Sequence, residues 1–224
     1  MPCVAKAICF AAGIQALVLS GVHSDVAGGQ NGIAAGALLQ FNVRVHRLQL
    51  RVEGIPQVSL PQRPSAKYGQ ATPQLSLLNG ALLVAVDPAE HLWLGAGETI
   101  INQRTPLPNL SQVVASRLAG MRYEAAYRLP LRSGRFVQFM AGGAPQLTGT
   151  DHFIFSNEQL PVDKPEIASE LDAMAAIGFH HRDYEVLFGI RTINFSAKFV
   201  RDGSAADRNN GAGLLFEYRR LLGR

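Results

Sequence analysis

The sequence predicts an all-β protein, an eight-stranded antiparallel up-and-down β-barrel that crosses a membrane. In several segments apolar and polar residues alternate with a period of two, which places them on opposite faces of a strand. Short and long connections alternate between these segments, as in barrels with short turns at one end and longer loops at the other. Beyond residue 24, no apolar run is long enough for a membrane-spanning helix.

The first 24 residues have the pattern of a secretory signal, which leaves residues 25–224 as the predicted barrel domain. Lys6 supplies the positive charge and residues 7–22 the apolar stretch, and Val22 and Ser24 fit the two positions that signal peptidase reads. The apolar stretch is short for a membrane anchor of about 20 residues. We therefore expect cleavage after Ser24 and export to the bacterial outer membrane.

Composition excludes several kinds of chemistry. Both cysteines, Cys3 and Cys9, lie in the predicted signal, so the mature chain would have no disulfide and no thiol nucleophile. The 21 lysines and arginines exceed the 17 acidic residues, but no basic cluster is interleaved with aromatic residues, which argues against a nucleic-acid partner. No group of His, Asp and Glu has the spacing of metal ligands, and no cofactor is expected.

Eight segments carry the strand pattern. They are residues 36–52, 75–86, 91–101, 119–131, 135–147, 170–179, 184–196 and 214–219. In the first segment the apolar residues change parity near His46 and Arg47. A hairpin there would explain the change but would give nine strands, whereas single-chain bacterial barrels have even numbers, so a bulge is the preferred interpretation.

The connections give the predicted barrel an orientation. Residues 87–90, 132–134 and 181–183 read as short periplasmic turns, and residues 54–74, 102–113, 148–168 and 200–210 read as four external loops. A soluble lipocalin-type barrel has the same strand number and period. Charged residues opposite the apolar face, and strands that could run beyond the roughly 9 to 11 residues needed for a bilayer, favour the membrane.

One polar track lies on the predicted lipid-facing side of residues 184–196. The apolar face of this strand continues into Thr192, Asn194 and Ser196 near the external end. A bare amide or hydroxyl in hydrocarbon costs free energy, so these groups should meet either interfacial water or a lipid. We take all three as candidate lipid-binding residues and outer-membrane lipid as the expected partner; the oligomeric state is left open.

The same region resembles a known family. Residues 189–196, with the sequence GIRTINFS, and Asn209, Asn210 and Gly211 before the last strand are similar to the lipid A deacylases, also called acyloxyacyl hydrolases. These are eight-stranded outer-membrane barrels, and the resemblance covers roughly half of the chain. It implies a serine that attacks an ester of lipid A, a histidine two residues earlier that acts as base, and an acidic residue at the start of the last strand.

The resemblance places the family's serine on Ser196, which becomes the candidate nucleophile. Asn194 stands in the place of the histidine, and the acidic position falls near Ala212 or Gly213. An amide does not accept a proton at neutral pH, so Asn194 is not a general base. We therefore expect a structural or lipid-binding barrel that lacks this hydrolysis. Two alternatives stay open: an esterase that deacylates lipid A through Ser196 with another base, and a soluble lipocalin-like ligand carrier.

Overall fold

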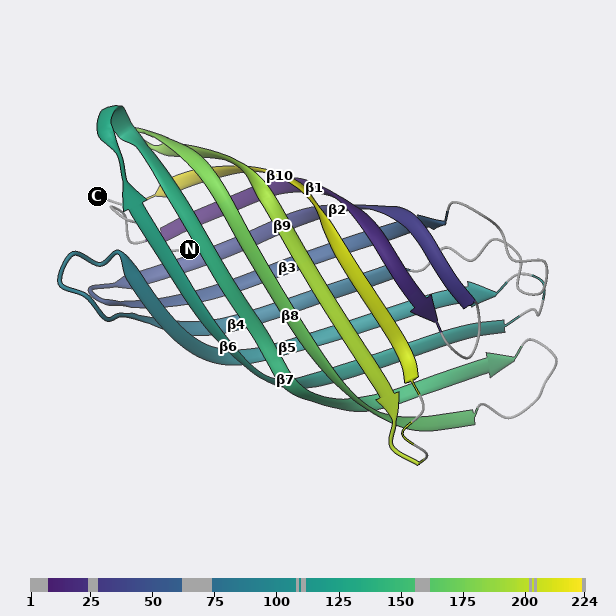
Figure 1. The fold of residues 1–224 in the computed structure, drawn as a ribbon. Coiled ribbons are helices and arrows are strands. Elements are labelled where there is room, and N and C mark those ends of the chain that lie inside the picture. The colour runs from purple at the N-terminus through teal and green to yellow at the C-terminus, as the bar shows by residue number, and fades with distance from the viewer. Residues whose placement is uncertain are drawn as a thin grey trace.

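The computed structural model describes residues 8–23, 28–61, 74–107, 109, 112–155, 162–201, 203 and 205–222, and these form one closed barrel of ten antiparallel strands (Figure 1). The strands are β1 (Ile8–His23), β2 (Gly28–Val45), β3 (Leu48–Pro61), β4 (Gln74–Ala85), β5 (Leu92–Leu107), β6 (Gln112–Pro130), β7 (Arg135–Phe155), β8 (Val162–His181), β9 (Tyr184–Phe199) and β10 (Ala205–Leu222). Each strand pairs with its neighbours in sequence, and β1 pairs with β10 to close the barrel. In the described part of the chain, no helix has the length and apolar character to cross a membrane.

The expected number of eight strands is wrong, and the parity change near His46 is one reason. Residues 36–52 belong to two strands, because β2 and β3 pair from Val45 and Leu48 outward. His46 has a φ of 53°, a left-handed conformation that allows a tight two-residue reversal. The parity change therefore marks a hairpin and not a bulge. Its sequence lacks the Asn-Gly or Asp-Gly pair that usually identifies such a turn.

The second reason is the apolar segment near the N-terminus. Ile8–His23 forms β1, which pairs with β2 along one edge and with β10 along the other. Periodicity alone does not separate a short apolar run in a strand from one in another buried or exported segment. The expected cleavage point after Ser24 lies outside the described residues, and cleavage there stays a prediction. Cleavage would remove β1, so the ten-stranded barrel and every feature that includes β1 belong to the uncleaved chain.

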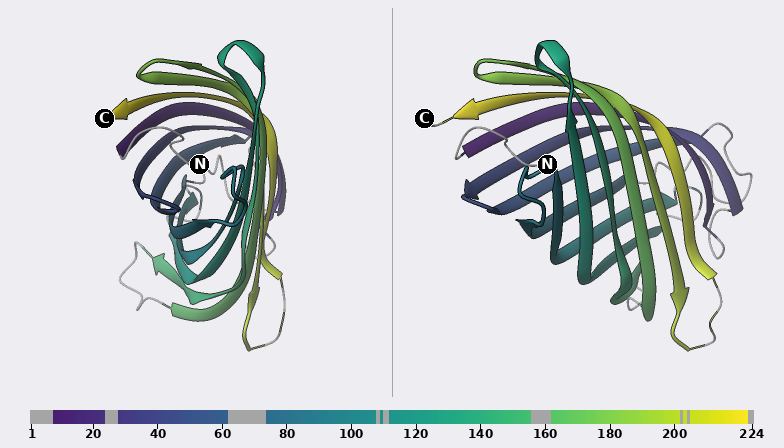
Figure 2. Two further views of the ribbon diagram at one scale, coloured as in Figure 1. Left: turned by 90° about the vertical axis from the view of Figure 1, so that its left-hand side faces the viewer. Right: turned by 60° about the vertical axis from the view of Figure 1, so that its left-hand side comes forward.

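All the short turns lie at one end of the barrel, together with the first residue of β1 and the last residue of β10 (Figures 1 and 2). Four turns and five loops replace the expected three and four, and β7 and β8 extend well into the segment predicted as a loop at 148–168. Each turn contains one residue other than glycine with positive φ. These are His46, Glu90, Ser133 and Arg182. The Ser133 turn includes a short 3₁₀ helix, η2 (Arg132–Gly134).

The pairing register fixes the tilt of the strands. Following the ladder once around the barrel leads from Val186 on β9 to Lys198 on the same strand, twelve residues closer to the loops. A ten-stranded barrel with this stagger has strands tilted by about 40°. Rows of cross-strand neighbours therefore climb toward the loop end as they pass from β9 through β10 and β1 to β5.

Charged side chains occupy the middle of the barrel interior. Arg122 donates hydrogen bonds to Glu170 at 2.6 Å and to Asp172. Arg191 donates to Asp172 at 2.5 Å and to Glu53 at 2.9 Å. These side chains are at most 3% exposed, so each charge depends on its partners instead of on water. A second ionic group lies nearer the turns, where Arg128 and Arg219 both contact Glu185.

An apolar cluster fills the interior nearer the loops. Its larger members are Leu38, Ile55, Leu77, Ile101, Leu118, Ile193, Phe195 and Phe199. On β6 and β9, Leu118 and Phe195 lie closer to the loops than Arg122 and Arg191 do. The interior thus has an apolar layer above an ionic layer, and smaller apolar clusters around Trp93 and around Phe136 lie nearer the turns.

The outer wall is mainly apolar. Large hydrophobic side chains are exposed on every strand, including Ile14, Leu39, Leu82, Tyr123, Leu171, Phe188 and Leu214. Near the turns, Tyr184 stacks on Tyr218 with ring centroids 5.8 Å apart. Exposed apolar residues outside and buried charges inside are the pattern of a membrane barrel, the reverse of a soluble one.

Candidate lipid-facing site

Strand β9 places the three predicted lipid-binding residues on the outer face. Thr192, Asn194 and Ser196 are partly exposed and alternate with the buried Ile193 and Phe195. The alternation follows from the period of two, since successive side chains of a strand point to opposite faces. Asn194 and Ser196 therefore interrupt an outer wall that is apolar further down the same strand.

The position of Ser196 along the barrel places it near an interface. Tyr184, at the turn end of β9, and Ser196 are twelve residues apart. At about 3.3 Å per residue and a tilt of about 40°, they are separated by about 30 Å along the barrel axis. This equals the usual thickness of a bilayer's hydrocarbon core. If the Tyr184 ring marks one boundary of that core, Ser196 lies at the other.

Neighbouring strands add polar groups that the sequence analysis missed. Ser169 on β8 pairs with Ser196, and Asn210 on β10 pairs with Asn194. Both additional residues are exposed. Directly opposite residues on one face of a sheet have Cβ atoms about 5 Å apart, so the four side chains form one polar group across three strands. Only the strand register, which the sequence did not give, brings them together.

A hollow of about 550 Å³ lies beside this polar group. Ser169, Asn194, Ser196 and Asn210 line it on one side, and the apolar part includes Tyr123, Gly143, Pro145 and Leu171. Strand β7 passes through the same region, and its register shifts against both neighbours. Against β6 the shift lies between Ala119 and Tyr123 of β6, and against β8 it lies between Ala144 and Leu147 of β7. Register slips bend a strand locally, and we attribute the hollow to them. Thr192 lies outside it and lines a smaller adjoining hollow.

The described side chains on the outer face place no base beside Ser196; Glu170, which also lines the hollow, is buried and accepts a hydrogen bond from Arg122 inside the barrel. His152, near the loop end of β7, pairs with Asp163, with His Nδ1 and Asp Oδ1 2.6 Å apart. Asp163 is six residues from Ser169 along β8, about 20 Å at the usual strand rise. His180 and His181 lie at the opposite end of the barrel. The acidic position of the resembling family holds Ala212, which pairs with Thr192 and has no carboxylate.

The outward side chains that the structure describes in the hollow combine neutral polar groups with an apolar floor. Its hydroxyls and amides donate and accept hydrogen bonds at neutral pH, and its floor is apolar. A serine hydroxyl without an adjacent base is a weak nucleophile. The described residues contain no group of three or more His, Cys, Asp or Glu able to hold a metal ion. Asn194 and Ser196 can thus bind a polar group, and no described outward side chain in the hollow is a base.

Comparison with known proteins identifies the fold. No family model and no curated protein matches the chain. Among solved structures, the outer membrane protease OmpT from Escherichia coli is similar over 96% of this chain and 97% of its own, with a TM-score of 0.50 and 8% identity. Neisserial surface protein A is similar over 95% of this chain and 97% of its own, with a TM-score of 0.41 and 11% identity.

The beta domain of the Bordetella autotransporter BrkA is similar over 96% of this chain and 99% of its own, with a TM-score of 0.47 and 10% identity. Identities this low speak for the fold and not for activity. The likeness to OmpT agrees with the strand pairing and the apolar outer wall described above. The chain therefore has the closed antiparallel β-barrel fold of outer-membrane proteins.

Proposed function

We propose that this protein spans the bacterial outer membrane and binds an outer-leaflet lipid in the hollow beside Asn194 and Ser196, without hydrolysing it. The observation that carries the proposal is the polar group of Ser169, Asn194, Ser196 and Asn210, which shares one hollow with the apolar outward side chains of Tyr123 and Leu171. Polar groups in hydrocarbon are costly unless they are satisfied. The esters and amides of a lipid's upper acyl region would satisfy them at this depth.

Two further features support binding over catalysis. The apolar part of the hollow lies toward the membrane centre from the polar part, which matches a lipid with acyl chains directed inward. His152 is engaged with Asp163, which lies about 20 Å along β8 from Ser169, so this base is out of reach of Ser196. Deacylation would need a proton acceptor within hydrogen-bond reach of the serine.

The binding claim is tested by native mass spectrometry of the full chain in detergent, with lipid A as the probe. The double variant Asn194→Leu, Ser196→Val removes two hydrogen-bonding groups and keeps the wall apolar. We expect it to bind lipid A about tenfold more weakly, or worse, at this site. Thr192→Val is the matched control because Thr192 lies on the same face outside the hollow. Equal binding by the double variant and wild type would reject the site.

The claim that no hydrolysis occurs is tested on lipid A extracted from cells with and without the gene. The acyl-chain count should be identical in both extracts. A gene-dependent loss of one acyl chain that disappears in Ser196→Ala would instead establish an esterase with Ser196 as nucleophile.

A further inference from the structure

A second depression shares β9 and β10 with the hollow beside Ser196 and extends from them in the other direction around the outer wall. It has a volume of about 1420 Å³ and crosses β9, β10, β1, β2, β3, β4 and β5. We call it the outer groove. One complete row of cross-strand neighbours lines it, leading from Ile190 through Ala16 and Ala35 to Gln74 and Arg104. The groove therefore follows the hydrogen-bond direction of the sheet.

The course of the groove takes it from the middle of the membrane toward the outer surface. Six inter-strand steps of about 4.8 Å give it a length of about 29 Å. Because the strands tilt by about 40°, the row rises by about 18 Å from Ile190 to Arg104. Ile190 lies six residues above Tyr184, near mid-membrane, so Arg104 reaches the level estimated for Ser196.

Short side chains form the floor of the groove. Ala16, Ala35 and Ala37 point outward at its centre. Larger outward side chains flank them, with Ile14, Leu214 and Phe216 on one side and Val58 on the other. The Phe188 and Phe216 rings lie 4.9 Å apart, centroid to centroid, at the lower end. A linear hydrocarbon chain fits a trough of this kind.

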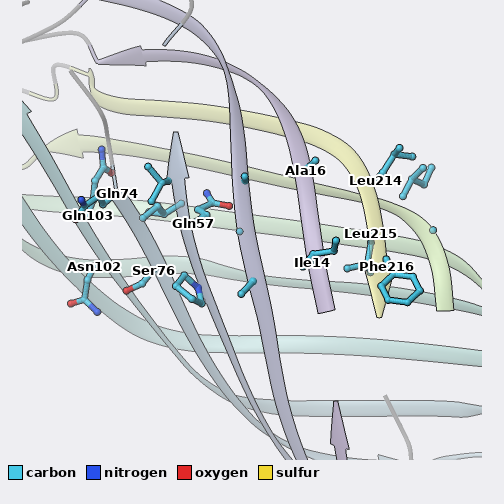
Figure 3. A pocket seen from close by; sticks show the side chains of 18 of the residues that line it. Ile14, Ala16, Gln57, Gln74, Ser76, Asn102, Gln103, Leu214, Leu215 and Phe216 are labelled. Carbon is cyan, nitrogen blue, oxygen red and sulfur yellow. The ribbon is translucent and has the colours of Figure 1, made fainter. Parts of the chain in front are cut away.

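The upper end of the groove is polar and positively charged. Figure 3 shows Gln74, Ser76 and Asn102 at one end and Ile14, Leu214 and Phe216 at the other. Arg104 lines the same polar end and is exposed. Arg117 is exposed on the next strand, where it pairs with Asn102, which makes it a diagonal neighbour of Arg104. Two guanidinium groups and two amides suit a phosphate, because guanidinium binds phosphate bidentately.

We propose that the outer groove holds one acyl chain of an outer-leaflet lipid whose phosphate is bound by Arg104 and Arg117. The apolar trough, its position in the outer half of the membrane and the cationic polar end together match one lipid molecule and its orientation. This second lipid site is separate from the hollow at Ser196, whose lining runs from β6 to β10 and whose outward polar groups are neutral.

The test counts lipid molecules on the full chain by native mass spectrometry in detergent, with diphosphoryl lipid A as the probe and a dephosphorylated form beside it. Wild type should bind two molecules of the phosphorylated probe. Arg104→Gln should weaken one of them about tenfold, the loss expected for one charge-assisted hydrogen bond to phosphate. Arg220→Gln, an exposed arginine at the turn end, is the matched control.

The trough is tested separately with Ala35→Trp, which fills its floor, against Ala96→Trp, which changes another outward alanine outside the groove. Ala35→Trp should abolish binding of the lipid molecule that depends on Arg104, whereas Ala96→Trp should not. Binding of the dephosphorylated probe should be the same in Arg104→Gln and in wild type. The proposal is overturned if both Arg104→Gln and Ala35→Trp bind the phosphorylated probe like wild type. It is also overturned if Ala35→Trp changes lipid binding only in a dimer of the chain and not in the monomer. Variants at Asn194 and Ser196 should remove the other molecule, so the two sites succeed or fail separately.

Discussion

Arg122 on β6 reaches across β7 to Glu170 on β8, donating a hydrogen bond from Nη1 to Oε2 at 2.6 Å. Nη2 of Arg122 donates a second hydrogen bond to Asp172, which lies two residues after Glu170 on β8. Both carboxylates are buried, and Asp172 is shared with Arg191. One arginine thus connects strands that are not adjacent in the sheet.

Arg122→Met should destabilise the barrel by about 3–5 kcal/mol, because it leaves two buried carboxylates without their main counter-charge. The measurement is urea unfolding in detergent micelles, followed by fluorescence of the only tryptophan, Trp93, which is buried. Arg104→Gln, at an exposed position, serves as control and should unfold like wild type. An unchanged midpoint for Arg122→Met would show that the network contributes little.

Gly142→Ala should also disturb this network. A Cβ at Gly142 would overlap the Arg122 guanidinium and lie 3.0 Å from Asp172 Oδ1. We expect a loss of about 1–3 kcal/mol, as in other overpacked interiors. Gly54→Ala is the matched substitution, because a Cβ there meets nothing within 4 Å. If both variants unfold at the wild-type midpoint, Arg122 does not depend on the open space above Gly142.

The purified barrel should show no steady conductance in planar bilayers. The apolar and ionic layers of the interior consist of buried side chains in mutual contact. Barrels with few strands are filled by such side chains, whereas porins with 16 to 18 strands leave a channel. A porin inserted under the same conditions provides the positive control, and a stable ohmic current from this protein would contradict a filled interior.

A chain that begins at Asp25 lacks β1 and should fail to form the ten-stranded barrel. Without β1, the edges of β2 and β10 lose their partner, and unpaired backbone groups are not tolerated in a lipid-exposed sheet. The expected result is loss of the heat-dependent mobility shift on semi-native gels. The chain that starts at Ile8 should keep the shift. A shift in the shorter chain would show that β1 is dispensable, and the intact mass of membrane-extracted protein would test cleavage after Ser24.

Glu98→Leu should stabilise the protein. Glu98 on β5 is exposed on the outer face and pairs with Gly80 and Met121, at a depth where the wall is otherwise apolar. A lipid-facing charge destabilises a membrane barrel, so we expect Glu98→Leu to raise the free energy of unfolding by about 1 kcal/mol. Unfolding in lipid vesicles measures it, with Glu53→Leu expected to act in the opposite direction because Glu53 binds Arg191.

The sequence correctly predicted the strands whose two faces differ most. Residues 119–131 alternate between outward tyrosines and inward charges such as Arg122 and Glu124, and they lie almost entirely within β6. Residues 184–196 likewise lie within β9, and the outward placement of Asn194 and Ser196 follows from their parity alone. An alternation of period two is enough to predict a strand, and the face on which each residue lies, where the inner and outer faces select different residue types.

The sequence was misleading where the two faces are alike or where a turn lacks glycine. In β1 the apolar run obscures the alternation, and at His46 the reversal depends on a left-handed residue that no local pattern indicates. The hollow and the outer groove could not be predicted, because only the register of the strand pairs places Ser169 opposite Ser196 and puts Ala16 and Arg104 on one row of cross-strand neighbours. Register is a property of the assembled barrel.

The barrel wall is a single layer of backbone, and adjacent residues such as Phe195 and Ser196 have separate tasks. Phe195 packs into the interior cluster, while Ser196 faces the surroundings. Substitutions at outward positions can therefore alter what the wall recognises with little effect on what holds it closed. Such a protein is suited to diversification of its lipid contacts, and its outer face is a natural scaffold for engineering recognition inside a membrane.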